Sequence, residues 1–132
     1  MDAVAAIAVS SLNTASQRMQ VSASNLANRN DAAPLGGSGV AGPAPFVPTR
    51  ADPVSLGPGG VQAQLAAVQP ASAPAYSPDS PFADSAGMVA LPDVDPTRQM
   101  VELTQALQQY RASAALLDAD NRMQGSALKM LR

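Results

Sequence analysis

The sequence predicts a mainly α fold, in which long helices at the two ends of the chain pair as a coiled coil around a small irregular insert of β-strands and loops. All 12 prolines lie between Pro34 and Pro96, and eight of the nine glycines lie between Gly36 and Gly87. Both end segments repeat apolar residues every seven positions, which is typical of paired helices. Residues that break helices are therefore confined to the middle of the chain.

Three segments follow from this distribution. We expect an N-terminal coiled-coil helix at 1–30, a Pro/Gly-rich insert with short β-strands at 31–95, and a C-terminal coiled-coil helix at 96–132, with the two helices forming one inner-core domain. The chain has 132 residues, and only 3% of them are aromatic. Because large side chains provide most of the burial energy and small domains bury a limited share of their surface, we expect partner subunits to complete the core.

The first helix is expected over residues 2–28. Its two heptad rows are Ala5, Leu12, Met19 and Leu26, and Ala8, Ala15 and Ser22. Only Asp2 and Arg18 are charged, and such a neutral polar surface can pack against several neighbours without burying an unpaired charge. Two interpretations stay open, a partly disordered tail in the lone monomer and an ordered helix in an assembly. Asn25 and Asn28 are candidates to cap this helix or to bond a neighbour.

The second helix is expected over residues 96–132, because Asp95 can cap it and proline is favoured at the first helical position. Its two heptad rows are Met100, Leu107, Ala114, Asn121 and Leu128, and Leu103, Tyr110, Leu117, Gln124 and Leu131. Lys129 and Arg132 in the last turn suit the helix dipole. Asn121 and Gln124 either fix the register of the seam or mark a fraying end. Tyr110 is interpreted as a core anchor, with a binding role as the alternative.

The insert is expected to form a two- or three-stranded antiparallel ribbon, because it has too few large apolar residues to fill a barrel or a sandwich. Polar and apolar residues alternate over Val61–Leu65, as in a half-buried strand. Phe46–Val47 and Met88–Leu91 are shorter candidate strands, each stopped by proline. Gly36–Gly39 is expected to be a flexible linker, and Tyr76–Pro81 is rich in turn-forming residues.

Composition argues against several functions. The net charge of −2 does not favour nucleic-acid binding, and the chain has neither cysteine nor histidine, so the usual zinc ligands and the commonest general base are missing. The acidic residues between Asp79 and Asp95 lack the spacing of a calcium loop and are interpreted as turn and cap residues. No stretch approaches the roughly 20 apolar residues of a membrane span, and Ala3–Val9 is short for a cleaved signal. We expect no enzyme, no cofactor, no metal and no membrane span.

Two stretches resemble a known family. Ser22–Asn28, which reads SASNLAN, resembles the signature of bacterial flagellar rod and hook proteins. The segments Tyr76–Asp84, Gly87–Val89, Pro92–Pro96 and Met100–Leu103 resemble the proximal rod members of the flagellar basal-body rod family, as does Tyr110-Arg111-Ala112 in the last helix. The chain departs from the family at Arg29–Pro34, where many relatives carry a Thr-Pro-Gly-Tyr-like turn, and over Pro34–Pro58, which matches poorly.

The resemblance implies a structural subunit of the bacterial flagellum. Such proteins are exported unfolded by the flagellar type III apparatus without a cleaved signal, and they stack helically into the hollow periplasmic rod. Their terminal helices form the inner coiled-coil layer, and the rod transmits torque and passes later subunits. The implied partners are copies of the chain itself, other rod proteins, the junction of the export gate with the MS ring, and the export apparatus during secretion.

We therefore predict a proximal-rod subunit. The residues expected to carry helix pairing and assembly are Leu12, Met19, Asn25, Leu26, Asn28, Met100, Leu103, Leu107, Tyr110 and Leu117. The alternatives are another axial protein of the rod and hook family, or a soluble helical binding module or secretion adaptor that engages one partner.

Overall fold

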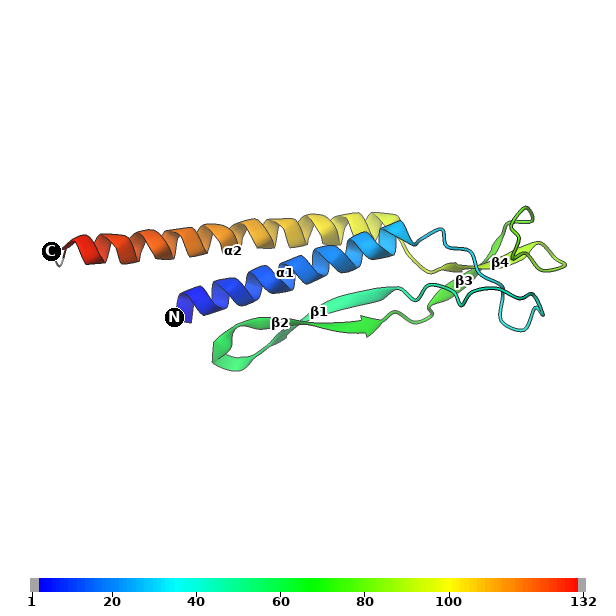
Figure 1. Cartoon of the computed structure of the whole chain (residues 1–132), viewed down its shortest axis with the longest axis horizontal. Coiled ribbons are helices and arrows are strands. Elements are labelled where there is room, and N and C mark those ends of the chain that lie inside the picture. The colour runs from blue at the N-terminus through cyan, green and yellow to red at the C-terminus, as the bar shows by residue number, and fades with distance from the viewer. Residues whose placement is uncertain (1–2, 131–132) are drawn as a thin grey trace.

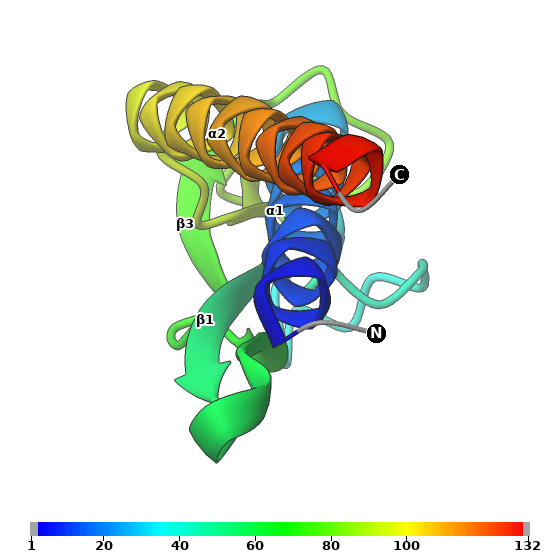
Figure 2. The same cartoon turned by 90° about the vertical axis from the view of Figure 1, so that its left-hand side faces the viewer.

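The computed structural model describes residues 3–130, which form two long helices and two small β-sheets (Figure 1). The elements are α1 (Ala3–Ala27), β1 (Thr49–Ser55), the 3-10 helix η1 (Gly57–Gly59), β2 (Val61–Ala67), β3 (Ser72–Tyr76), β4 (Met88–Pro92) and α2 (Pro96–Met130). α1 and α2 run antiparallel and side by side, and the end-on view places α1 between α2 and the β1–β2 hairpin (Figure 2). The β3–β4 sheet lies beyond the end of α1 (Figure 1).

The prediction of a mainly α fold is wrong. About half of the chain is helical and about a fifth is strand, so the protein is better described as α+β. The insert contains two separate two-stranded antiparallel sheets, β1–β2 and β3–β4, where an irregular β and loop segment was expected. Its strands consist largely of small and polar residues, which are held by backbone pairing and, in β1 and β2, by contact with α1. A search for large apolar residues therefore underestimates them.

β1 shows why a strand was missed. Its sequence, TRADPVS, contains Pro53, which usually argues against a strand because proline donates no ladder bond. The Val68 amide donates to the Pro48 carbonyl at one end of the hairpin, and the Leu56 amide donates to the Gly60 carbonyl at the other. Because bonded pairs alternate in an antiparallel ladder, Pro53 falls at a position whose nitrogen points away from β2. The candidate strand at Phe46–Val47 is wrong, since these residues precede β1.

The second sheet contains the most buried large side chain of the insert. Val89 of β4 is fully buried, and Ala33 extends the sheet by bonding Ala90 through both backbone groups, at 3.0 and 2.8 Å. Strand β4 overlaps the candidate strand Met88–Leu91, as β2 overlaps Val61–Leu65. The segment that follows α1 is thereby tied to the strand that leads into α2.

α2 begins where the Asp-Pro pair predicted. Asp95 Oδ1 accepts hydrogen bonds from the backbone amides of Thr97, at 2.9 Å, and Arg98, at 3.3 Å, which satisfies two of the amides left open at a helix start. The positions predicted at Asp2, Leu131 and Arg132 lie outside the described residues. Over residues 3–130, neither helix combines the length and hydropathy that a membrane crossing requires.

Candidate assembly interface

The seam between α1 and α2 is built from small residues. The buried residues of α1 are Ala8, Thr14, Ala15, Ser22 and Asn25, and those of α2 are Ala106, Ser113 and Asp120. Ala15 and Ala106 are completely inaccessible to solvent. Small side chains at seven-residue spacing allow two helix backbones to approach closely, so the seam has little room for larger groups.

Polar side chains bond across this seam. Ser11 Oγ accepts a hydrogen bond from Gln109 Nε2 at 3.2 Å and lies 2.8 Å from Ser113 Oγ. Arg18 Nη1 donates to Gln109 Oε1 at 3.0 Å. Among the described residues, no buried side-chain nitrogen or oxygen lacks a partner. These directional contacts favour one alignment of the two helices, whereas alanine contacts alone discriminate poorly between alignments.

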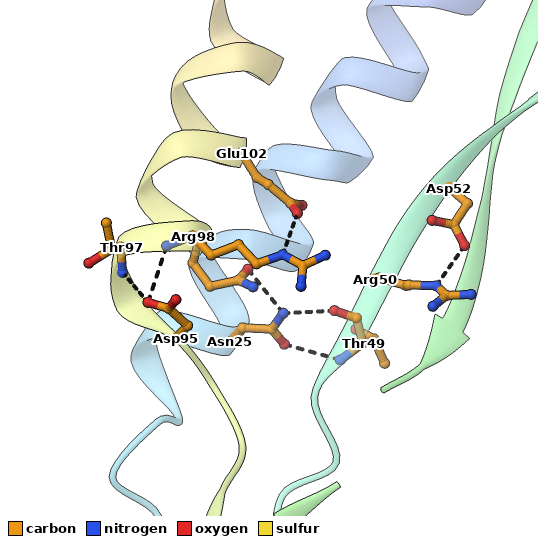
Figure 3. Close-up of polar contacts among 9 residues, drawn as sticks. Asn25, Thr49, Arg50, Asp52, Asp95, Thr97, Arg98 and Glu102 are labelled. Atoms are coloured by element: carbon orange, nitrogen blue, oxygen red, sulfur yellow. Dashed lines mark hydrogen bonds and ion pairs between the residues drawn. The ribbon is translucent and has the colours of Figure 1, made fainter. Parts of the chain in front are cut away.

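Asn25 joins α1, β1 and α2 near the C-terminal end of α1 (Figure 3). Its Nδ2 donates to the Thr49 carbonyl at 2.7 Å and to Gln99 Oε1 of α2 at 3.2 Å, while its Oδ1 accepts from the Thr49 amide at 3.2 Å. The side-chain amide thus pairs with Thr49 much as a neighbouring strand would. Asn25 is almost completely buried, so the loss of these bonds would leave backbone groups unsatisfied.

The hairpin is anchored to α1 a second time near its tip. Ser10 Oγ accepts from the Val61 amide at 3.2 Å, and Thr14 Oγ1 donates to the Val61 carbonyl at 3.1 Å. Ser10 and Asn25 are separated by about 22 Å of helix, and the six residue steps of a hairpin strand cover about 20 Å. The two anchors therefore match the length of the hairpin, which lies along α1 (Figure 1).

Gly60 allows the close approach at the tip. Its φ of +111° belongs to the region that favours glycine, and a Cβ at this position would collide with the Ser10 side chain. The glycine thus combines an unusual backbone conformation with contact to α1.

The large apolar residues of α2 lie mostly outside the seam. Exposed side chains on this helix include Met100, Val101, Leu107, Tyr110, Leu116 and Met123. A shallow groove of about 330 Å³ runs along the first half of α2 and is lined by Thr97, Met100, Val101, Thr104, Gln105 and Gln108. Exposed apolar side chains that cluster in this way are typical of surfaces that contact other proteins.

The structure divides the predicted pairing residues into three groups. Asn25 is buried; Leu12, Met19, Leu26, Asn28, Leu103 and Leu117 are half-buried; and Met100, Leu107 and Tyr110 are exposed. The buried row of α2 contains Ala106 and Ser113, one residue before the predicted Leu107 and Ala114. Whether the predicted residues carry assembly stays a prediction, since their contacts with other subunits are not part of a single chain.

Several interface residues were not singled out from the sequence. They are Ser10, Ser11, Thr14, Gln99, Gln109 and Ser113. Their hydroxyl and amide groups resemble those of any solvated helix surface, and the only available signal was their spacing of three, four or seven residues. Of the polar pair predicted at the end of the seam, Asn121 is exposed, and Gln124 Nε2 donates to buried Asp120 Oδ2 at 2.8 Å.

Asp84 serves a turn of the insert, as the sequence predicted for its acidic residues. Asp84 Oδ1 accepts from the backbone amides of Ala86, at 2.8 Å, and Met88, at 2.9 Å, which closes the connection between β3 and β4. Within the part of the chain that the structure describes, no group of three or more acidic side chains is arranged to hold a metal ion.

The C-terminal part of the chain matches a known protein family. Residues 85–130 match the family described as "Flagellar basal body rod FlgEFG protein C-terminal". The match covers β4 and all of α2, the helix that carries the groove and one side of the seam.

Curated relatives extend the similarity over most of the chain. The flagellar basal-body rod protein FlgC of Escherichia coli O6:H1 is 35% identical over 115 residues, which cover 85% of this chain and 84% of the relative. FlgC of Yersinia enterocolitica is 34% identical over 113 residues, and FlgC of Salmonella typhimurium is 34% identical over 120 residues, with the same coverage of each chain.

Proposed function

The chain belongs to the family of flagellar basal-body rod proteins and is a structural subunit of the rod, and we propose that it assembles helically with its own copies and other rod proteins into a hollow drive shaft. The observation that carries this conclusion is the similarity to FlgC proteins over 85% of the chain. In this role the subunit transmits torque, and the lumen of the shaft passes exported subunits. Its work is mechanical and involves no catalysis.

The geometry of the helix pair supports this proposal. α1 and α2 pack against each other through a seam of small and polar residues, and α2 leaves Met100, Leu107 and Tyr110 exposed. Burying a large apolar side chain contributes roughly 1.5–3 kcal/mol. Contact with neighbouring subunits would recover this energy, so these residues are available to stabilise an assembly.

The location and the route to it are drawn from the family. The rod is the site of FlgC proteins in the basal body, as their name states. We place this chain in the periplasmic part of the rod, reached through the flagellar type III export apparatus without a cleaved signal. Its further neighbours in this proposal are the other rod proteins and the junction of the export gate with the MS ring.

Substitution at Leu107 tests the proposal. Leu107 lies on α2 outside the seam, so Leu107→Asp should abolish rod assembly and motility while the circular dichroism of the isolated subunit changes little. The same outcome is expected for Leu26→Asp, although half-buried Leu26 lies closer to the seam. The conservative variant Leu107→Met should retain assembly, because it keeps an apolar side chain of similar volume.

The readouts are swimming motility and the presence of the chain in purified basal bodies. A motile strain that carries Leu107→Asp would contradict the proposed role of this residue. Recovery of the wild-type chain only from the cytosol, as a stable one-to-one complex with another protein, would favour the adaptor alternative over the rod.

A further inference from the structure

Most outer strand edges of the two small sheets are closed to a further strand. Proteins commonly block such edges, because unpaired backbone groups attract another chain. The edge of β4 is filled by Ala33, which bonds both backbone groups of Ala90. β1 and β3 each carry a proline at the centre, Pro53 and Pro74, whose nitrogen points away from the partner strand and offers no amide to a new one. Over residues 3–130, three of the four edges are therefore filled or interrupted.

The outer edge of β2 is open. The register that turns the proline of β1 outward also turns the backbone groups of Ala63, Leu65 and Ala67 away from β1, and no hydrogen bond is described for these groups within residues 3–130. The Ala63 side chain is buried, but Leu65 is 59% exposed and Ala67 is also exposed. A hollow of about 400 Å³ is lined by Gln62–Leu65 and Val54. Consecutive strand residues point to opposite faces, so this hollow follows the edge of β2.

The twist of the hairpin explains why this edge is free. α1 bonds the outer edge of β1 at Thr49 and the outer edge of β2 at Val61, so the hairpin crosses the helix. Ala67 is the ladder partner of Thr49, and at this level α1 lies on the β1 side. The edge with Leu65 and Ala67 therefore points away from α1. Figure 1 shows the end of β2 on the far side of β1 from the helix.

The segment that leads into β1 has the complementary property. Residues 41–47 form no strand in the single chain, and no hydrogen bond of their backbone is described within residues 3–130. Pro43 and Pro45 fix their own φ and favour an extended conformation in the residues before them. In an extended chain both prolines lie on one side, so the backbone groups of Ala44 and Phe46 stay free on the other. Such a segment can add to one strand edge and then stops the sheet.

We propose that residues 42–47 of one subunit add as a strand to the open edge of β2 in a second copy, beside Leu65 and Ala67. Main-chain amides and carbonyls form the contact. Residues 42–47 run in the direction of β1, and β2 is antiparallel to β1. Copies that point the same way along a shaft therefore meet in antiparallel pairing, which is the more stable kind.

The proposed contact suits a growing polar assembly. It is heterologous, because two different surfaces meet, and such contacts propagate into rings or helical filaments. Residues 42–47 precede the level of Leu65 by about six residues of strand, so neighbouring copies are offset by at most about 20 Å along the strand direction. The hairpin lies on the side of α1 opposite α2, so the exposed surface of α2 stays free for other neighbours (Figure 2). The inference rests on the proposed rod function and names one surface through which copies meet.

Leu65→Pro tests the backbone pairing. The Leu65 amide points away from β1, so proline removes a donor of the open edge and keeps the ladder, as Pro53 does in β1. Incorporation into basal bodies should fall at least several-fold, while circular dichroism and hydrogen exchange of the isolated subunit show an intact hairpin. Leu65→Ala, which keeps the amide, and Ser55→Pro, on the outer edge of β1, are the controls and should be incorporated like the wild type.

Cysteine cross-linking tests the contact independently of the proline variant, because the chain has no cysteine of its own. Ala44→Cys and Leu65→Cys are produced in the same cells, and isolated basal bodies are treated with a short thiol cross-linker. A linked dimer is expected from the mixture, and none is expected from either variant alone. Ala44→Cys combined with Leu116→Cys is the control and should give no dimer, since exposed Leu116 lies on α2.

The outcomes separate the inference from the proposed function. Basal bodies that contain both cysteine variants but yield no linked dimer would overturn the inference and leave the rod function intact. Normal incorporation of a folded Leu65→Pro chain, or an equal loss with Leu65→Ala, would overturn it as well. Absence of the wild-type chain from basal bodies would instead overturn the proposed function.

Discussion

The seam between α1 and α2 buries small and polar side chains, whereas the outer surface of α2 exposes large apolar ones. A common globular protein shows the reverse distribution. The seam contains Ala15, Ala106 and hydrogen-bonded polar groups, whereas the outer surface carries Met100 and Leu107. Small and polar contacts determine how the helices align, but they bury little apolar area. The comparison teaches that small and polar contacts specify the shape of the single chain, while the exposed apolar side chains of α2 stay available for the neighbouring subunits of the proposed assembly.

The largest effect on the seam is expected from Ala106→Leu. Ala106 is fully buried, so the added side chain must push the helices apart, and the free energy of unfolding should fall by about 3 kcal/mol. Chemical denaturation followed by circular dichroism measures this loss. Ala114→Leu, at an exposed position of the same helix, is the matched control and should change stability little. Equal effects of the two substitutions would contradict the distinction between seam and outer surface.

The second effect concerns the junction of helices and hairpin. Asn25→Ala removes hydrogen bonds to Thr49 and Gln99 and should lower the free energy of unfolding by about 2 kcal/mol, because buried groups lose their partners. Hydrogen exchange at the Thr49 amide should accelerate. Asn28→Ala serves as the control, since the hydrogen bonds described for the Asn28 side chain go only to Ser24, one turn earlier in the same helix. An Asn25 variant as stable as the Asn28 variant would show that the junction contributes nothing.

A smaller effect is expected at the hairpin tip. Gly60→Ala introduces a Cβ at a positive φ and against the Ser10 side chain, so it should destabilise the protein by about 1–2 kcal/mol. The loss should appear as faster hydrogen exchange in β2. Gly59→Ala is the control, because a Cβ there meets nothing within 4 Å. Unchanged exchange in both variants would mean that the tip is not anchored on α1.

The smallest effect is expected for a surface charge in the lone subunit. Glu102→Gln removes the ion pair with Arg98, whose side chain is 73% exposed, so the free energy of unfolding should change by less than about 0.5 kcal/mol. Denaturation of the isolated subunit measures this value. A loss above about 1 kcal/mol would contradict this expectation and show that the pair contributes to the stability of the single chain.

The sequence predicted the helices better than the strands. Prolines and glycines confined to the middle located both helices, and Asp95-Pro96 located the start of α2. The strand with Pro53 could not be recognised, because its tolerance of proline depends on pairing register, which only the folded hairpin defines. The abundance of small strand residues likewise concealed the β content and led to the wrong fold class.

The residues of the candidate interface were likewise predicted only in part, because small residues were again overlooked. Selecting the largest apolar residue of each heptad placed the α2 row at Leu107, whereas the buried row passes through neighbouring Ala106. In α1 the small row with Ala8 and Ala15 was recognised, and it is the buried one. A seam of small residues is visible in a sequence only when small size, and not hydrophobicity, is taken as the signal.

The central claim is that large apolar residues of α2 are buried between subunits and not within one. A high-resolution cryo-electron microscopy map of isolated basal bodies tests it most directly. We predict that Met100 and Leu107 of this chain contact a neighbouring subunit, while Ala106 continues to face α1 of its own chain. A map in which Met100 and Leu107 face solvent, or in which α1 and α2 of one chain lie apart, would contradict the account.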